Sequence, residues 1–384
     1  MKLSGVKVVD LSRFLPGPHL TMAMADHGAE VIKVEAHDGD PTREIGLRKH
    51  GQSVYFRNTN RGKRGLRLDL KHPDGREILM RLAAGADVLV ESFRPGVAER
   101  LGIGYDAVSA RAPQIVYCSI SAFGQTGAYR DKPAHDLAVQ ALAGVASLSL
   151  GQDGRPAPPS MAVADVAVSL TALAGILMAL LKQRQTGRGD HLDIAMHDAL
   201  LAWTPHVTPP VFAEGRAPVP KRERYWGGNA FYDLYETGDG QWLALGGAEP
   251  KFAENFLAKA GRADLAHHAR APAGSQEPLT AYLRELFKTQ TLAEWLDWLA
   301  DVDACYAPVR TLREGIHDPN TRARGMLLVD EHGDEHLGVP IKFAREPARP
   351  ELRAPGLGEH SVEIVKGLGY SDADVERLRA ERVI

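Results

Sequence analysis

The feature that most constrains this chain is the alternation of short apolar runs with helix-like segments along residues 1–121. Runs typical of buried strands cover residues 6–12, 29–35, 87–93 and 114–121. Helical patterns lie between them, at residues 19–28, which Gly28 closes, and at residues 74–86. Strands that alternate with helices predict an α/β fold with a parallel sheet, helices on its faces and a ligand crevice at the carboxyl ends of the strands.

The turn after the first strand-like run limits the ligands that such a sheet binds. It reads DLSRFLPGPHLT and has no G-x-G-x-x-G. Because that pattern lets the backbone approach a pyrophosphate, its absence argues against a nicotinamide or flavin dinucleotide.

Patterns farther along the chain predict further elements. Residues 166–181 are apolar and uncharged but shorter than a membrane span of roughly 20 residues, which predicts a buried core helix. Residues 205–228 are rich in Pro, Gly and charge, as linkers are. Alternating apolar residues around the Gly-Asp-Gly at 238–240 predict a β-hairpin. Ser371 is expected to cap a helix over residues 371–383.

Composition limits the binding partners, the metal or disulfide sites and the cellular location that we expect. The formal net charge is −3, so nothing in the overall charge favours nucleic acid or an anionic membrane as a partner. Cys118 and Cys305 lie far apart and outside any metal-ligand spacing, which predicts neither a disulfide framework nor a metal site. The first residues have no apolar signal segment, so we expect a cytoplasmic protein.

Two polar residues stand before helical segments and are candidates for chemistry. Asp165 directly precedes a long apolar stretch, so its carboxylate is expected near a helix N-terminus, where free amides stabilise an anion or a developing oxyanion. The alternative is a simple N-cap aspartate. His135 is either a base within reach of the same site or a histidine that only begins a helix. The residues alone leave these alternatives open.

Glycines and basic side chains suggest where a ligand would bind. Gly246 and Gly247 follow the strand-like QWLAL and would let the backbone approach a ligand closely. The basic side chains that would hold phosphate are Arg57, Arg61, Lys63, Arg64, Arg67, Arg94 and Arg100. The alternative is a solvated basic face.

A series of motifs follows in order along nearly the whole chain. They are LSGVKVVDLS, GAEVIKVE, GDPTR, NRGKRGLRLDLK, ADVLVESFRPGVAERLGIGY, ISAFGQTGAYRDKPAHDLAVQALAG, RQTGRGDHLDIAMHDA and APGLGEHSVEIVKGLGYS. In this order they resemble the class III CoA-transferase superfamily of CaiB/BaiF type, which includes formyl-CoA transferases and α-methylacyl-CoA racemases.

The resemblance implies a large Rossmann-like domain, a smaller α+β domain, and a homodimer of two interlocked rings. Its substrate would be coenzyme A as an acyl thioester, with no permanently bound cofactor, and a small carboxylic acid. The division that follows is a large domain over residues 1–204 and 338–384, linkers over 205–228 and 321–337, and a small domain over 229–320.

The resemblance also implies roles for individual residues. Asp165 matches the family's catalytic aspartate, and Gly246 and Gly247 are candidate oxyanion donors. The implied CoA site consists of Arg43, Leu68, Ser92, Phe93, Arg94 and Arg100. At Ser92 the formyl-CoA transferase pattern has asparagine, and Arg94 is placed to pair with the distal carboxylate of a substrate such as succinate.

Two reactions on this scaffold remain, and we take the transferase as the first hypothesis. There Asp165 attacks the acyl-CoA carbonyl and forms covalent anhydride and thioester intermediates. GDPTR and GQSVYFRNTNRGKRGLRLDL resemble the transferases, and the glycine run that often follows the aspartate in racemases is absent after Asp165.

The alternative is an α-methylacyl-CoA racemase, in which His135 and Asp165 exchange the α-proton from opposite faces. Glu249 matches a glutamate that assists the histidine in that branch, whereas transferases commonly carry tyrosine at the position of His135. A third hypothesis is a non-catalytic acyl-CoA binding protein that keeps the fold alone.

Overall fold

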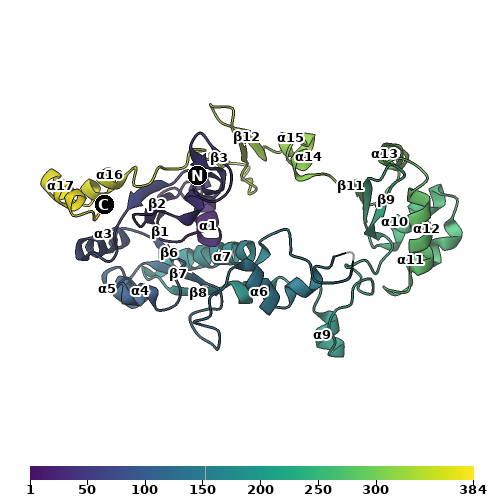
Figure 1. Ribbon diagram of the computed structural model, residues 1–384, viewed down its shortest axis with the longest axis horizontal. Coiled ribbons are helices and arrows are strands. Elements are labelled where there is room, and N and C mark those ends of the chain that lie inside the picture. Colours follow the sequence, from purple (N-terminus) through teal and green to yellow (C-terminus); the bar gives the residue numbers. More distant parts are fainter. Residues whose placement is uncertain (152) are drawn as a thin grey trace. The chain divides into compact units, whose positions relative to one another are not determined.

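The computed structural model describes residues 1–151 and 153–384, and these residues form two compact units. One unit consists of Met1–Trp203 and Pro319–Ile384, and the other of Thr204–Asp318. The predicted α/β class is confirmed, with a parallel sheet in the first unit and a small antiparallel sheet in the second (Figure 1). The domain boundaries and the interlocked dimer stay predictions.

A six-stranded parallel sheet forms the centre of the first unit. Its strands, in spatial order, are β5 (Arg64–Arg67), β2 (Glu30–Glu35), β1 (Lys7–Asp10), β6 (Val88–Glu91), β7 (Val116–Ser121) and β8 (His191–Ala195). Along the chain, β1, β2 and β5 come first and are added to the sheet in one direction. β6, β7 and β8 come next and are added on the other side of β1. The order therefore reverses between β1 and β6, and ligands of open α/β sheets bind at such a reversal, beyond the carboxyl ends of the strands.

Helices cover both faces of this sheet. The helices of this unit are α1 (Pro16–Asp26), α2 (Val54–Asn60), α3 (Pro73–Ala84), α4 (Val97–Arg100), α5 (Tyr105–Arg111), α6 (Asp136–Leu142), α7 (Val163–Thr186), α8 (Met196–Ala202), α15 (Pro319–Ala323), which packs against β12 instead, α16 (Ser361–Gly367) and α17 (Asp372–Ala380). Two 3₁₀ helices, η1 and η2, and four short strands complete the unit; these are η1 (Pro41–Arg43), η2 (Val145–Leu148), β3 (Arg48–Lys49), β4 (Gln52–Ser53), β12 (Leu327–Val329) and β13 (Glu335–Leu337).

The alternation of side chains along each strand divides the interior into two cores. Val9 of β1 packs with α3, α5, α16 and α17, whereas Val8 packs with α1, α7 and α8. The C-terminal helices therefore return to the sheet beside α3, and the terminal Ile384 is buried there (Figure 1). Ser371 caps α17 as predicted, since its hydroxyl accepts a hydrogen bond from the amide of Asp374.

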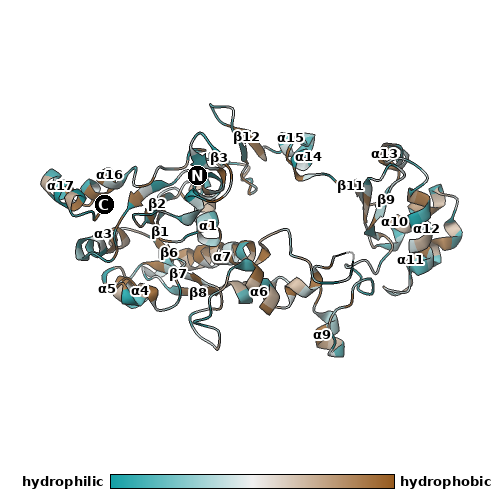
Figure 2. Ribbon diagram, in the orientation of Figure 1, coloured by the Kyte–Doolittle hydropathy of each residue, from teal (hydrophilic) through white to brown (hydrophobic). Residues whose placement is uncertain are grey.

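Helix α7 is the only helix among the described residues that is long and apolar enough to cross a membrane by length and composition alone. It packs against α1, β7, β8 and α8, as predicted for a core helix, and Ile176 on it is fully buried. One side of α7 is exposed, however, although Figure 2 shows that the helix consists largely of hydrophobic residues. Met178 is 70% exposed and Leu181 is 68% exposed.

The second unit has its own apolar core around Phe256 and Trp295. Its elements are α9 (Pro209–Glu214), β9 (Tyr232–Glu236), β10 (Trp242–Gly246), α10 (Pro250–Lys259), η3 (Ala263–Leu265), α11 (Ala266–Ala269), α12 (Glu277–Phe287), α13 (Leu292–Leu299), β11 (Tyr306–Pro308) and α14 (Leu312–Ile316). The predicted hairpin is confirmed, because β9 and β10 pair antiparallel across a turn in which Gly240 has a φ of +74°.

A buried network of charges lies between the sheet and α1. Its four side chains have no exposed surface, and they form two ion pairs, Asp10 with Lys63 and Lys33 with Asp40, each with an N–O distance of 2.9 Å. Thr21 of α1 donates to Asp10 at 2.7 Å. Burial by itself would raise the pKa of Asp10, but the two lysines and the hydroxyls of Ser12 and Thr21 outweigh it and lower that pKa to about 2.

The same network shapes the loop between β1 and α1. Phe14 has a φ of +65°, an uncommon conformation for a residue with a side chain. Its amide donates to Asp40 at 3.4 Å, and the Lys33 ammonium donates to the carbonyl of Ser12 at 2.6 Å. A Cβ on Gly17 would lie 2.1 Å from the Ser12 hydroxyl, so only glycine fits there. The network therefore holds a strained loop at the point where the strand order reverses.

We predict that Lys63→Met lowers the free energy of unfolding by about 3–5 kcal/mol, because it leaves the Asp10 carboxylate buried without its direct cation. The measurement is urea denaturation at pH 7, followed by fluorescence. Lys71→Met, at an exposed lysine on the same unit, is the control and should change stability by less than about 0.5 kcal/mol. Equal stability of the two variants would contradict the role given to the network.

Candidate functional site

Asp165 lies in the first turn of α7, at the third helical position. The N-cap is Ala162, so the alternative that Asp165 merely caps the helix is wrong. Its side chain is partly buried and accepts no hydrogen bond from any residue the structure describes. Burial raises the pKa of Asp165, the nearby charge of Asp136 raises it further, and the result is a pKa of about 7.

The amides at the start of α7 are occupied by Asp136. One carboxylate oxygen of Asp136 accepts from the amide of Ala164 at 2.7 Å and from that of Asp165 at 3.2 Å. The expectation that these amides are free to stabilise an oxyanion is therefore wrong, because an acidic side chain already satisfies them. The sequence reasoning missed Asp136, although it stands directly after His135.

His135 is the N-cap residue of α6, and its side chain is exposed. Its ring meets the ring of Phe14 edge to face, with the ring centres 5.4 Å apart and the planes at 80°. The next residue, Asp136, binds the amide of Asp165. The structure thus brings the starts of α6 and α7 together, and with them the backbones of His135 and Asp165 (Figure 1).

Tyr55 is a second polar residue of this region that the sequence reasoning did not single out. It lies on α2, half-buried. Burial raises the pKa of its phenol, and the negative charges of Asp165 and Asp40 raise it further. The hydroxyl is therefore protonated at neutral pH and lies close enough to Asp165 to feel its charge. The only sequence signal was its place in the segment GQSVYFRNTN.

Two of the predicted CoA-site residues are engaged within the fold. Arg43 makes two hydrogen bonds to Glu35, at 2.8 and 2.6 Å, and its guanidinium lies 3.8 Å from the centre of the Phe56 ring. Leu68 is 1% exposed and belongs to the core, so a ligand would meet its backbone rather than its side chain. The assignment of both residues to a CoA site stays a prediction.

The other four lie just beyond the end of β6, where the strand order reverses. Ser92 accepts from the amide of Arg13 at 3.0 Å, and the amide of Phe93 donates to buried Glu91 at 2.7 Å. Arg94 and Arg100 are exposed, and among the described residues neither guanidinium has an ion-pair or hydrogen-bond partner. The crevice expected at the carboxyl ends of β1 and β6 therefore carries free positive charge.

The larger basic cluster, by contrast, is structural. Arg61 is buried against Asp26, and Lys63 against Asp10. Arg57 pairs with Asp334 of the β12–β13 hairpin, and Arg64 joins Glu30 and Glu363. Arg67 donates to the carbonyl of Ile384 at 3.3 Å. Acidic side chains therefore already pair with Arg57, Arg61, Lys63 and Arg64, which contradicts the hypothesis that these four hold phosphate, whereas for Arg67 it stays a prediction.

Three predicted residues belong to the second unit. Gly246 ends β10, and its amide donates to the carbonyl of Cys305 at 2.8 Å, so it is not a free oxyanion donor. A Cβ on Gly247 would lie 2.5 Å from the ring of Phe252, so that glycine is required by packing. Glu249 is the N-cap residue of α10, and its side chain caps nothing there.

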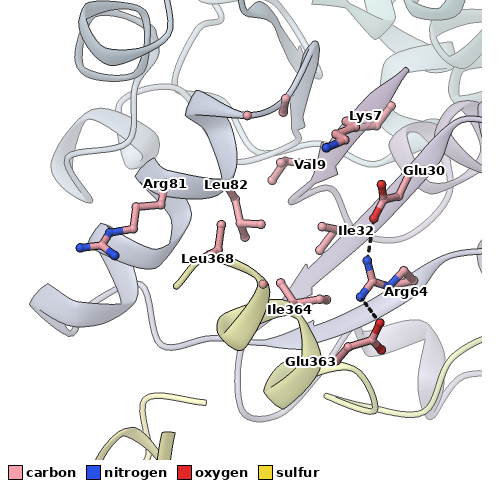
Figure 3. Close-up of a pocket in the computed structure, with 14 residues that line it drawn as sticks. Lys7, Val9, Glu30, Ile32, Arg64, Arg81, Leu82, Glu363, Ile364 and Leu368 are labelled. Carbon is pink, nitrogen blue, oxygen red and sulfur yellow. Dashed lines mark hydrogen bonds and ion pairs between the residues drawn. The ribbon is translucent and has the colours of Figure 1, made fainter. Parts of the chain in front are cut away.

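A cavity of about 420 Å³ lies at the opposite, amino-terminal end of the sheet (Figure 3). Its apolar floor includes Val9, Ile32 and Ile364, and Arg64 closes part of its rim by pairing with Glu30 and Glu363. Of the residues singled out from the sequence, only Arg64 lines it, and Arg64 is paired with two glutamates. Ligands of open α/β sheets bind at the carboxyl edge, and for that reason we take the carboxyl edge as the site.

Comparison with known proteins agrees on one family. The profile described as "CoA-transferase family III" matches residues 3–361. The chain is 33% identical to an α-methylacyl-CoA racemase of Mus musculus, over 100% of this chain and 98% of the racemase. It is also 33% identical to a succinate–glutarate CoA-transferase of Agrobacterium fabrum, over 95% of each. A CAIB/BAIF family protein from Brucella suis has a similar structure, with a TM-score of 0.83, 32% identity, and coverage of 95% of this chain and 99% of that one.

The raised pKa of Asp165 makes stability depend on pH. The folded state keeps a proton that the unfolded state, with a carboxyl pKa of 3.8, releases, so stability is lost as the pH rises from about 4 to about 7. We therefore predict that Asp165→Asn stabilises the protein by about 2 kcal/mol more at pH 8 than at pH 5. Thermal unfolding across this range measures the difference, and the exposed Asp38, changed to Asn, is the control. A pH-independent effect of Asp165→Asn would show that its carboxyl ionises normally.

Proposed function

The chain belongs to CoA-transferase family III, and on this premise we propose that it is an acyl-CoA:carboxylate CoA-transferase with Asp165 as its nucleophile. The observation that carries the proposal is the state of that carboxyl. It is partly buried and bound by no hydrogen-bond donor or cation among the described residues. A carboxylate attacks a carbonyl best when it is poorly solvated and unpaired, and a pKa of about 7 leaves much of it ionised at neutral pH while making it more basic than an ordinary aspartate.

The reaction then proceeds through covalent steps in which no proton is gained or lost. Asp165 attacks the thioester carbonyl and expels CoA thiolate, which leaves a mixed anhydride. The thiolate attacks the aspartyl carbonyl of this anhydride, the donor carboxylate leaves, and an aspartyl-CoA thioester remains. An acceptor carboxylate attacks that thioester and releases the thiolate, which takes the new acyl group and restores Asp165.

The charges at the reversal of strand order support the placement of CoA. Arg94 and Arg100 are exposed without partners, and CoA carries phosphates that such guanidinium groups bind. Arg43, which the family resemblance assigns to the CoA site, is held in position by Glu35. The transferase-like segment also contributes Tyr55, whose hydroxyl is a hydrogen-bond donor near Asp165.

A racemase is the second candidate, favoured by one specific observation. Asp136 binds the amide of Asp165 and stands next to His135, which brings an imidazole and a carboxyl, two groups that can carry a proton, to one place. By the family resemblance, Glu249 matches the glutamate that assists the histidine in racemases. The racemase and transferase relatives are equally similar to this chain, each at 33% identity.

We also propose a homodimer. Leu170, Leu177, Met178 and Leu181 lie along one side of α7 and are all at least 41% exposed. A row of exposed apolar side chains at helical spacing is typical of an interface, and the family resemblance implies a second copy of the chain as its occupant.

The reaction is tested by incubating the protein in deuterium oxide with succinyl-CoA, 2-methylacyl-CoA thioesters and candidate free acids. We predict new thioesters of the added acids without deuterium at the α-carbon, loss of at least about 10³-fold in rate for Asp165→Ala, and retained exchange for His135→Ala. Mass spectrometry of the thioesters is the measurement, and Asp38→Asn is the control.

Deuterium at the α-carbon of a 2-methylacyl-CoA, with no exchange of acids and with loss of activity in both His135→Ala and Asp165→Ala, would instead establish the racemase. If the protein without substitutions binds CoA but transforms no thioester, the result would support the binding-protein hypothesis and contradict both the transferase and the racemase hypotheses.

The dimer is tested by the double variant Leu177→Glu/Leu181→Glu. Buried charges at an interface are unpaired and unfavourable, so we expect the mass in solution to fall from that of two chains to that of one, with circular dichroism unchanged. Light scattering after size exclusion is the measurement, and Lys182→Glu, at an exposed position on α7, is the control. The dimer proposal would be overturned if the protein without substitutions had the mass of a single chain in solution.

A further inference from the structure

We propose that Asp136 is a positioning residue that joins the start of α7 to the start of α6 and sets the charge around the Asp165 carboxyl. The proposal rests on the proposed function only in taking Asp165 as the reactive group. It is carried by the contacts of Asp136 on both helices.

The geometry of Asp136 explains how the two helix ends are held. Its Oδ1 accepts from the amides of Ala164 and Asp165, at 2.7 and 3.2 Å. Its Oδ2 accepts from Nε2 of buried Gln140, at 2.5 Å, and the same nitrogen donates to the carbonyl of Met161 at 3.1 Å. A side chain on α6 therefore caps α7, and Gln140 locks it in place. Any movement of Asp136 would shift the first turn of α7 and Asp165 with it.

The charge of Asp136 is not neutralised by a cation. Its three hydrogen-bond donors are two backbone amides and one carboxamide, and among the described residues no lysine or arginine pairs with it. A negative charge thus lies beside Asp165 in a partly buried setting, where charges interact more strongly than in water. Together with burial, it keeps the pKa of Asp165 near neutrality.

The other titratable groups around the first turns of α7 belong to α1, α2, α6, α8 and β8. Tyr55 of α2 is protonated at neutral pH. His19 of α1 bonds Ser169, one turn beyond Asp165, at 2.8 Å. His197 and Asp198 of α8 bond each other at 3.3 Å, and Asp193 of β8 accepts from the amide of Gln125. His135 begins α6 beside Asp136 itself. Among all the charged groups of this region, Asp136 is the one whose charge raises the pKa of Asp165.

The consequence for chemistry is a stronger base or nucleophile. A carboxylate whose proton binds tenfold more tightly is a better electron-pair donor towards a carbonyl carbon or an α-proton. Asp136 would thus make Asp165 reactive without touching the substrate, and would serve either reaction of this family.

The test compares Asp136→Asn, which keeps an oxygen for the two amides but removes the charge, with Asp136→Glu, which keeps the charge. In each background Asp165 is also changed to Asn, and the difference in melting temperature between the paired proteins is followed from pH 4 to pH 9. The slope of this difference against pH falls to zero as the folded-state Asp165 ionises, so the midpoint of that fall reports the ionisation of Asp165 without any activity. We expect Asp136→Asn to lower the midpoint by about one pH unit, a tenfold change in the ionisation constant, and Asp136→Glu to restore most of it. Asp131→Asn, at an exposed residue paired with Arg130, is the control.

An unchanged midpoint in Asp136→Asn would overturn the proposal, as would an equal shift in Asp136→Glu and Asp136→Asn, which would indicate a purely structural cap. If thioester exchange is measurable, the acid limb of its kcat/KM should move with the midpoint. If no exchange exists, the proposed function fails while the melting measurement still decides the role of Asp136.

Discussion

The structure depends on two ion pairs buried between the sheet and α1, Asp10 with Lys63 and Lys33 with Asp40. A charged side chain that is buried away from water destabilises the fold unless an opposite charge pairs with it. Hydrogen bonds must also satisfy its remaining donors and acceptors. These pairs meet that condition, because hydroxyls of Ser12 and Thr21 and backbone carbonyls complete the shell. The result is a rigid carboxyl edge of the sheet, and the strained loop through Phe14 is held there against the ring of His135.

The same residue type behaves in opposite ways at two places in this unit. Asp10 lies next to lysines, and its pKa falls to about 2, so it is always charged. Asp165 lies next to another carboxylate and no cation, and its pKa rises to about 7. Burial opposes the charge in both cases, and the sign of the neighbouring charge decides the outcome. The first arrangement stabilises the fold, whereas the second leaves a carboxyl whose pKa is close to neutral pH, and such shifted pKa values are common at functional sites.

This contrast also explains why one scaffold suits two reactions. A partly buried carboxyl with a near-neutral pKa is a nucleophile when a carbonyl faces it and a proton carrier when an α-carbon does. Which of these a thioester presents depends on how its acyl chain is held. The capped start of α7 and the exposed guanidinium groups of Arg94 and Arg100 would be common to both proposed reactions.

The amino-acid sequence alone was enough to predict the class of fold and to single out Asp165 as the candidate catalytic residue. Apolar periodicity is local, so four of the six strands of the sheet (β1, β2, β6 and β7), the hairpin of β9 and β10 and the Ser371 cap were predictable, and the motif order identified the family. Only the tertiary structure decided what each charge does. It turned Arg57, Arg61, Lys63 and Arg64 from candidate phosphate ligands into structural partners of acidic residues distant in sequence, and it revealed Asp136 and Tyr55 beside Asp165. The physical reason is that ionisation and hydrogen bonding depend on neighbours in space, and those neighbours come from other elements of the chain.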